Sequence, residues 1–130
     1  MNKNLKLTFK GLRKIWHKVP PDFYSQVDKN PLQSLWHGNK LKCIKQSIYK
    51  KPKNVLDAGC ADGSFLDKMT KFYPEAEFYG IDCYFKAIKY GKNKYPHLKL
   101  KVADVHKLPF KDKFFDLIIL AETLEHVVDP

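Results

Sequence analysis

Short apolar runs alternate with helical patterns from residue 53 to the end of the chain. The runs have the length and composition of strands, and they cover 54–57, 77–82, 98–103 and 115–121. The segments 63–72 and 85–94 are typical of helices, and a proline follows each within two residues. A further helix is expected to begin near Thr123. Strands that alternate with helices predict an α/β fold, a parallel sheet with helices on both faces.

Helical patterns also precede the first strand. Within 1–19, apolar residues at spacings of four, three and four form one helical stripe: Leu5, Phe9, Leu12 and Trp16. The pair Pro20-Pro21 ends this pattern. We interpret 22–31 as a connecting loop and 32–49 as a second helix. The expected organisation is a basic helical segment over residues 1–50 and an incomplete α/β domain over residues 51–130.

The positive charge of the chain is confined to its first part. The formal net charge is +10. Residues 1–53 hold twelve Lys and one Arg against two acids, whereas residues 54–130 hold eleven Lys against twelve acids. Such a segment can bind RNA or an anionic membrane surface. We favour a solvated lysine-rich face, because lysines without arginine forks or interleaved aromatics are weak evidence for nucleic-acid binding.

Bulk composition predicts a folded cytoplasmic domain. The 130 residues, 44% of them hydrophobic, suffice for one domain with a core. No apolar run has the length of a transmembrane helix, and the basic N-terminus lacks the apolar segment of a secretory signal. The three cysteines are widely spaced and form no CxxC pair. We therefore predict neither a metal site nor disulfides, and a reducing compartment.

The stretch VLDAGCADGSFLDKM, residues 55–69, joins a buried strand to a helix through an acid and two glycines four apart. Gly59 and Gly63 allow a tight turn that approaches a ligand closely. A pyrophosphate would suit such a turn at a helix N-terminus, but the dinucleotide fingerprint G-x-G-x-x-G is absent. Asp57 would repel a pyrophosphate and attract a cation. The loop therefore predicts a ligand with positive charge and disfavours a nicotinamide-dependent oxidoreductase.

Two further acids stand at the ends of predicted strands. Asp82 follows Gly59 by 23 residues, where an acid can accept both hydroxyls of a ribose. Asp104 follows the third strand, and its carboxylate with the N–H of Val105 could read an adenine edge. Each acid alone could instead cap a helix or a turn. Because ligands bind at the carboxyl ends of parallel strands, the acids and the glycine loop together predict a nucleoside with a cationic tail.

Four segments resemble the successive cofactor motifs of class I S-adenosylmethionine-dependent methyltransferases: VLDAGCADGSFL, FYGIDCY, KVADVHKLPF and FDLIILAETLEHVVDP. The nearest group includes methyltransferases of ubiquinone and menaquinone biosynthesis. The resemblance covers residues 32–130 and implies a Rossmann-like fold with S-adenosylmethionine as the cofactor. The family fold has seven strands with the fourth in the interior. Here the fourth strand would be an apolar edge, so we expect a fragment, or a sheet that a partner completes.

The resemblance also implies roles for individual residues. Asp57 would lie near the amino group of the methionine moiety, and Asp82 would hold the ribose. The full implied cofactor set is Asp57, Ala58, Gly59, Cys60, Gly63, Asp82, Cys83, Asp104, Val105, Ala121 and Glu122. Cys60 and Cys83 are interpreted as small packing residues. Ala61 departs from the family, where many members have glycine, so its backbone is expected to avoid positive φ.

The implied reaction is SN2 transfer of a methyl group to an O, N or C nucleophile on an unidentified acceptor. The enzyme mainly aligns the two partners, and it needs a base only if the nucleophile must lose a proton. His126 is the nearest candidate for that role, although we favour the interpretation that it caps or packs within its helix, and His106 is expected to be exposed. No catalytic residue is assigned. The alternative function is a non-catalytic RNA- or membrane-surface-binding module with a nucleoside-binding core.

Overall fold

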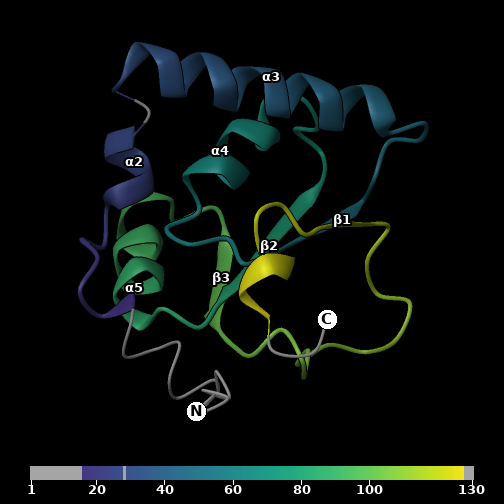
Figure 1. Ribbon diagram of the computed structural model, residues 1–130. Helices are drawn as coiled ribbons and strands as arrows, with labels where there is room; N and C mark the ends of the chain where they lie inside the picture. Colours follow the sequence, from purple (N-terminus) through teal and green to yellow (C-terminus); the bar gives the residue numbers. More distant parts are fainter. Residues whose placement is uncertain (1–15, 28, 128–130) are drawn as a thin grey trace, which may run out of the picture.

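Four parallel strands and four α-helices build the described part of the chain, residues 16–27 and 29–127. The computed structural model is shown in Figure 1. The helices are α2 (Phe23–Val27), α3 (Pro31–Ser47), α4 (Ser64–Thr70), α5 (Phe85–Lys94) and the 3₁₀ turn η1 (Leu124–His126). The strands are β1 (Asn54–Ala58), β2 (Glu77–Asp82), β3 (Lys99–Val102) and β4 (Leu117–Ile119).

The strands form one parallel sheet in the order β3-β2-β1-β4. The predicted parallel α/β sheet is confirmed. The fourth strand is shorter than the predicted 115–121, and it pairs with β1 over three residues. Within the described residues β4 forms one edge of the sheet. Ile118 and the neighbouring Leu120 are exposed there, which agrees with the expectation of an apolar edge.

The main core lies between the sheet and the helices α3, α4 and α5. Val55 of β1 and Leu100 of β3 are buried in it, and Leu66 and Met69 of α4 are fully buried. Figure 1 shows α3 running along one side of the molecule next to α4. The apolar residues that α3 and its C-terminal cap pack against this core are Leu41, Ile44 and Ile48.

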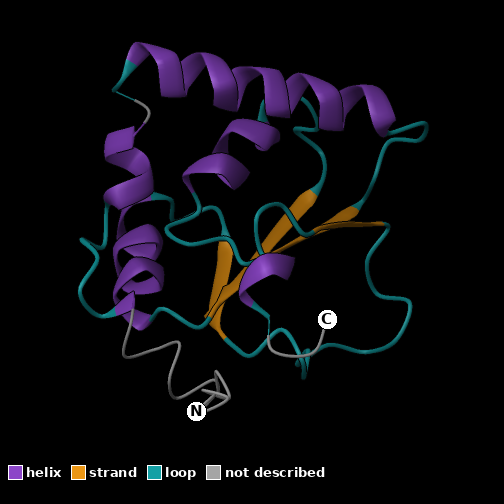
Figure 2. Cartoon of the chain, in the orientation of Figure 1, coloured by secondary structure: helices purple, strands orange, loops and turns teal. Residues whose placement is uncertain are grey.

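The opposite face of the sheet is covered by the connection between β3 and β4. Leu56 and Ile81 are buried on this face, and Phe110 and Phe115 pack against them. The connection must pass over β2 and β1 to reach the far edge, and it does so as a loop that contains Pro109 (Figure 2). The helices expected on both faces are therefore found on one face within the described residues.

One local prediction is wrong. Residues 22–31 were expected to be a loop, but they contain α2, which begins two residues after the proline pair. The Phe23 N–H donates to the Pro20 carbonyl at 3.1 Å. Proline is compatible with the first turn of a helix, so the pair precedes a new helix. The helix expected to begin near Thr123 is present as the 3₁₀ turn η1, with Thr123 as its N-cap. The apolar stripe in 1–19 lies outside the described residues except for Trp16.

The helix α3 confirms the prediction over 32–49. It begins where its capping residues place it: Asn30 accepts the Leu32 N–H at 3.1 Å, and Pro31 occupies the first position. None of the helices in the described ranges is both long and apolar enough to cross a membrane.

Gly91 of α5 tests how closely this helix packs on the loop after β1. A Cβ there would lie 2.2 Å from the Asp62 carbonyl oxygen, a backbone atom with little freedom to move. We expect Gly91→Ala to lower the free energy of unfolding in urea by about 1–3 kcal/mol. Gly38→Ala in α3 is the control, since nothing lies within 4 Å of the added Cβ, and it should be neutral or stabilising. Equal losses would contradict this packing.

Candidate functional site

The loop between β1 and α4 turns sharply against the end of β2. Gly59 and Gly63 have φ angles of +95° and +81°, a conformation that favours glycine. The N–H groups of Gly59 and Cys60 both donate to the Ile81 carbonyl, at 2.8 and 3.0 Å. The structure thus contains the glycine turn that the sequence predicts, and it ties that turn to the carboxyl end of the neighbouring strand.

Ala61 contradicts the expectation that its backbone avoids positive φ. Its φ is +48°, and its N–H donates to Asp82 Oδ2 at 2.8 Å. The left-handed conformation costs a non-glycine residue about 1–2 kcal/mol, which this hydrogen bond helps to offset. Glu122 also has a positive φ, of +56°. Both residues line the cavities described below, and strained backbone of this kind concentrates at functional sites.

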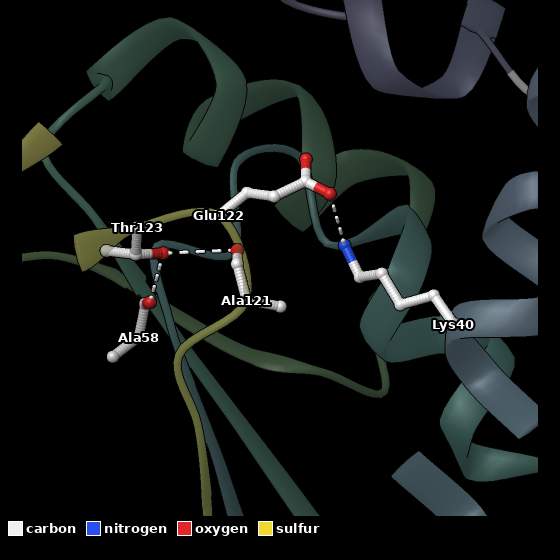
Figure 3. Close-up of polar contacts among 5 residues, drawn as sticks. All are labelled: Lys40, Ala58, Ala121, Glu122 and Thr123. Carbon is white, nitrogen blue, oxygen red and sulfur yellow. Dashed lines mark hydrogen bonds and ion pairs between the residues drawn. The ribbon is translucent and has the colours of Figure 1, made fainter. Parts of the chain in front are cut away.

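Gly59 packs closely against the segment that follows β4. A Cβ on Gly59 would lie 2.2 Å from Thr123 Oγ1. Thr123 is buried, and its hydroxyl donates to the Ala58 carbonyl at 2.9 Å (Figure 3). Thr123 was not predicted as a site residue. It joins the glycine loop to the segment after the fourth strand, so the two halves of the site are held in a fixed relation.

Asp82 uses both carboxylate oxygens to hold the backbone around it. Oδ2 accepts the Ala61 N–H and Oδ1 accepts the Tyr84 N–H, each at 2.8 Å. Burial raises the pKa of Asp82, and these hydrogen bonds offset part of the rise. The capping role that the sequence left open is therefore present. A carboxylate offers about four lone-pair sites, so Asp82 retains the capacity to accept ligand hydroxyls.

Asp104 lies two residues after β3, and its carboxylate is held by His106. Its Oδ1 accepts the His106 N–H at 2.9 Å and lies 2.6 Å from His106 Nδ1. Burial alone would raise the pKa of Asp104, but these contacts lower it below its ordinary value. Asp104 is therefore ionised at neutral pH. His106 is exposed, as predicted.

A cleft opens along the carboxyl ends of the strands. Its volume, counted with the open solvent at its mouth, is about 780 Å³. The opposite wall of this larger cleft comes from residues 16–24, among them Trp16, Pro20 and Tyr24. The predicted cofactor residues that line it are Gly59, Asp82, Cys83, Asp104, Val105 and Glu122.

A smaller cavity adjoins the larger cleft. The lining residues common to both are Tyr24, Gly59, Ala61 and Glu122. The predicted residues found only in the smaller cavity are Asp57, Cys60 and Ala121. Ala58 and Gly63 line neither. Ala58 is buried on the second face of the sheet, and Gly63 caps α4.

The carboxyl of Asp57 is buried beside the smaller cavity, with 4% of the residue exposed. No hydrogen bond reaches this side chain from the residues described. Burial raises the pKa of Asp57 to about 7. The charge of Lys40 lowers this pKa, and the charge of Asp82 raises it. A buried carboxyl without a donor is unfavourable. The cavity therefore favours a ligand that brings a positive charge and N–H donors.

Sequence reasoning missed the part played by the N-terminal segment. The N–H and the hydroxyl of Ser25 both donate to Asp62 Oδ2, at 3.1 and 2.6 Å, and Asp62 is fully buried. This pairing anchors α2 on the glycine loop and places Tyr24 against both cavities. From α3, His37 and Lys40 line the smaller cavity. Their one sequence signal is a spacing of three, which places them on one helix face.

His126 and the two site cysteines make packing contacts. His126 lines the larger cleft, and its ring packs edge-on against Trp16 with 5.7 Å between centroids. Burial raises the pKa of Cys83 to about 12 and the pKa of Cys60 well above its ordinary value. Both thiols therefore stay protonated at neutral pH, which agrees with their interpretation as packing residues.

The fold defines a Rossmann-like α/β domain with a cleft at the carboxyl edge of its sheet, where such folds bind ligands. A family model described as a methyltransferase domain matches residues 56–130, more than half of the chain. The chain belongs to this family. The resemblance to class I S-adenosylmethionine-dependent methyltransferases is thereby confirmed.

Individual relatives agree with this membership. The chain is 32% identical over 113 residues to the ubiquinone biosynthesis O-methyltransferase of Coxiella burnetii, covering 84% of this chain and 47% of that protein. It is 38% identical over 91 residues to norajmaline N-methyltransferase of Rauvolfia serpentina, covering 62% of this chain and 29% of that protein. The fold matches N-methyltransferase NodS of Bradyrhizobium japonicum, solved with S-adenosyl-L-homocysteine, with a TM-score of 0.70. The match covers 88% of this chain and 58% of that one, at 24% identity. The chain spans less than half the length of these two curated relatives.

The buried Asp57 carboxyl makes the stability of the fold pH-dependent. Its pKa rises from an ordinary value of 3.8 to about 7 in the fold. The folded state then holds a proton that the unfolded chain releases, so stability falls as pH rises from about 4 to 7. The displacement corresponds to at most about 4 kcal/mol. We expect Asp57→Asn to lose much less stability than the wild-type chain between pH 5 and 8.

Urea denaturation at the two pH values measures this difference. The control is Asp112→Asn, which removes an exposed carboxyl and should follow the wild-type pH dependence. If Asp57→Asn lost as much stability between pH 5 and pH 8 as the wild-type chain does, another group would carry the pH dependence.

Proposed function

We propose that this chain is the cofactor-binding part of an S-adenosylmethionine-dependent methyltransferase. The observation that carries the proposal is the arrangement of Asp57, Asp82 and Asp104 at successive strand ends around two adjoining cavities. A pyrophosphate is disfavoured beside the buried Asp57, whereas a nucleoside with a cationic end suits all three acids. Membership of the methyltransferase family supports the same ligand.

In this proposal the larger cleft takes the adenosine part of the cofactor. Asp82 accepts the ribose hydroxyls with the lone pairs that its two backbone contacts leave free. Asp104 and the Val105 N–H contact the adenine edge, with Cys83 packed beside them. The wall from Trp16 to Tyr24 covers the nucleoside and supplies apolar surface.

The smaller cavity takes the methionine part. The amino group of the cofactor is positively charged and carries N–H donors. It can therefore donate to the Asp57 carboxyl, which accepts no hydrogen bond from the described residues. Gly59 and Cys60 line this end, and Ala121 and Glu122 close it. The two remaining residues of the predicted set are Ala58 and Gly63. They support the loop without lining either cavity.

S-adenosylmethionine supplies a methyl group on a positively charged sulfur, which a nucleophile can attack. The residues of the chain hold the donor in one orientation and keep water away from it, which favours transfer by proximity. We assign no base and no acceptor. The relatives include both an O-methyltransferase and an N-methyltransferase by name, so the atom methylated does not follow from the family.

We propose that the basic segment 1–50 serves the domain 51–130 rather than RNA or a membrane surface. Its described part packs α3 on the core and α2 on the glycine loop. Lysines such as Lys42 and Lys45 are exposed, which suits a solvated face. A cytoplasmic location is part of the proposal, since all three cysteines are free thiols.

Titration calorimetry with S-adenosylhomocysteine tests the proposal. We expect Asp82→Asn to weaken binding by about 10- to 100-fold, the range for a hydrogen bond to a charged group. Asp116→Asn is the matched control, because Asp116 also accepts two backbone N–H groups, from Lys53 and Asn54, at the opposite end of the sheet. It should bind like the wild type. Preference for NAD, or no binding by the folded chain, would contradict the proposal.

A further inference from the structure

The outer face of α5 is a second concentration of positive charge, separate from residues 1–53. Residues 83–103 contain six lysines and no acid, whereas the rest of 54–130 contains five lysines and twelve acids. The charge balance of the whole domain does not reveal this surface, because acids elsewhere in the domain offset it. Four of the six lysines belong to α5, and all four are exposed: Lys86, Lys89, Lys92 and Lys94.

The lysines of α5 face solvent because the other face of the helix is buried. Ala87, Ile88 and Gly91 pack that face into the protein, and the lysines occupy the remaining positions of the helical repeat. The helix packs on β2 and β3, at the edge of the sheet opposite β4, as Figure 1 shows. It also lines the larger cleft through Ala87, so one helix carries both the cleft wall and the basic surface.

Aromatic side chains lie among these lysines. Phe85, the first residue of α5, is 49% exposed. Tyr90 is partly exposed and follows Lys86 by one helical turn. The Nζ of Lys94 lies 5.4 Å from the centroid of the Tyr90 ring. The α5 surface therefore combines lysines with interleaved aromatic side chains, the combination whose absence makes residues 1–53 weak evidence for nucleic-acid binding.

We propose that the outer face of α5 binds single-stranded nucleic acid. Lysine ammonium groups neutralise phosphates and release their counterions, and exposed rings provide surfaces on which unpaired bases stack. Lysine lacks the planar fork with which arginine reads base edges, so this surface binds without a strong sequence preference. The surface does not include the cofactor residues, and the inference therefore does not rest on the proposed function.

General attraction of a chain with a net charge of +10 to any polyanion is the competing explanation. Two pairs of exposed lysines separate the two explanations. Lys42 and Lys45 of α3 have the same spacing of three as Lys86 and Lys89 of α5. Changing either pair to glutamine removes two charges, and glutamine is about as good a helix former as lysine. General attraction would weaken equally in both double variants.

The experiment measures binding of a fluorescein-labelled oligouridylate by fluorescence anisotropy at several salt concentrations. A length of about 12 nucleotides lies within the site sizes of single-strand-binding folds. The proteins are the wild-type chain, Lys86→Gln with Lys89→Gln, and Lys42→Gln with Lys45→Gln. The slope of log Kd against log salt concentration reports the number of phosphates neutralised. A constant fraction of inactive protein does not change this slope, so partial unfolding of a variant does not obscure the result.

We expect the α5 double variant to reduce the slope by about 1.4, since each phosphate contact with a single strand contributes about 0.7. Its binding should weaken by about 10- to 25-fold near 0.1 M salt. The α3 double variant should keep the wild-type slope and bind within about twofold of the wild-type chain. Equal losses in the two double variants, an unchanged slope in the α5 variant, or no binding by the wild-type chain overturns the proposal.

The aromatic contribution is tested with Phe85→Ala. We expect this variant to bind the oligouridylate about fivefold or more weakly with an unchanged salt slope, because it loses base stacking and no charge. Tyr49→Ala is the control, since Tyr49 is 95% exposed outside α5, and it should bind like the wild-type chain. Wild-type affinity in Phe85→Ala, or equally tight α5-dependent binding to vesicles that contain phosphatidylserine, overturns the assignment to single-stranded nucleic acid.

Discussion

The buried carboxyl of Asp57 is the constraint on which the chemistry of the site depends. It lies in the central strand β1, it receives no hydrogen bond from the described residues, and burial raises its pKa to about 7. Such a group is unfavourable in a protein interior unless a ligand supplies what it lacks. An anionic ligand would raise the free energy of the ionised, buried Asp57 carboxyl further, whereas a cationic ligand would lower it. Lys40 and Glu122 line the same cavity as Asp57 and pair with each other at 3.5 Å.

The loop that carries this site is held from three directions. The backbone of Asp62 packs against Gly91 of α5, its carboxylate binds Ser25 of α2, and Gly59 packs against Thr123 beyond β4. These contacts come from elements far apart in the sequence. The strand–loop–helix unit alone therefore does not form the site, and the basic N-terminal segment forms one of its walls.

Local chemistry made the sheet and its strand-end acids predictable, because alternating strands and helices force Asp57, Asp82 and Asp104 to one edge. The φ of Ala61 was predicted wrongly, because a hydrogen bond to Asp82 governs it rather than the preference of alanine. Only its spacing of three from His37 marks Lys40 among the twelve lysines of the first 53 residues, since its burial depends on how α3 docks. The loop over the second face was missed for the same reason: its path depends on strand order.

A protonated Asp57 in the ligand-free protein is tested most directly by the number of protons released when S-adenosylhomocysteine binds. The measurement is titration calorimetry in buffers of different ionisation enthalpy, at pH 6 and pH 8. The ammonium group of the ligand is already charged at pH 6, so binding must expel the proton from Asp57. We predict the release of close to one proton per ligand at pH 6, declining toward zero at pH 8. Binding without proton release at pH 6 would contradict the role given to Asp57.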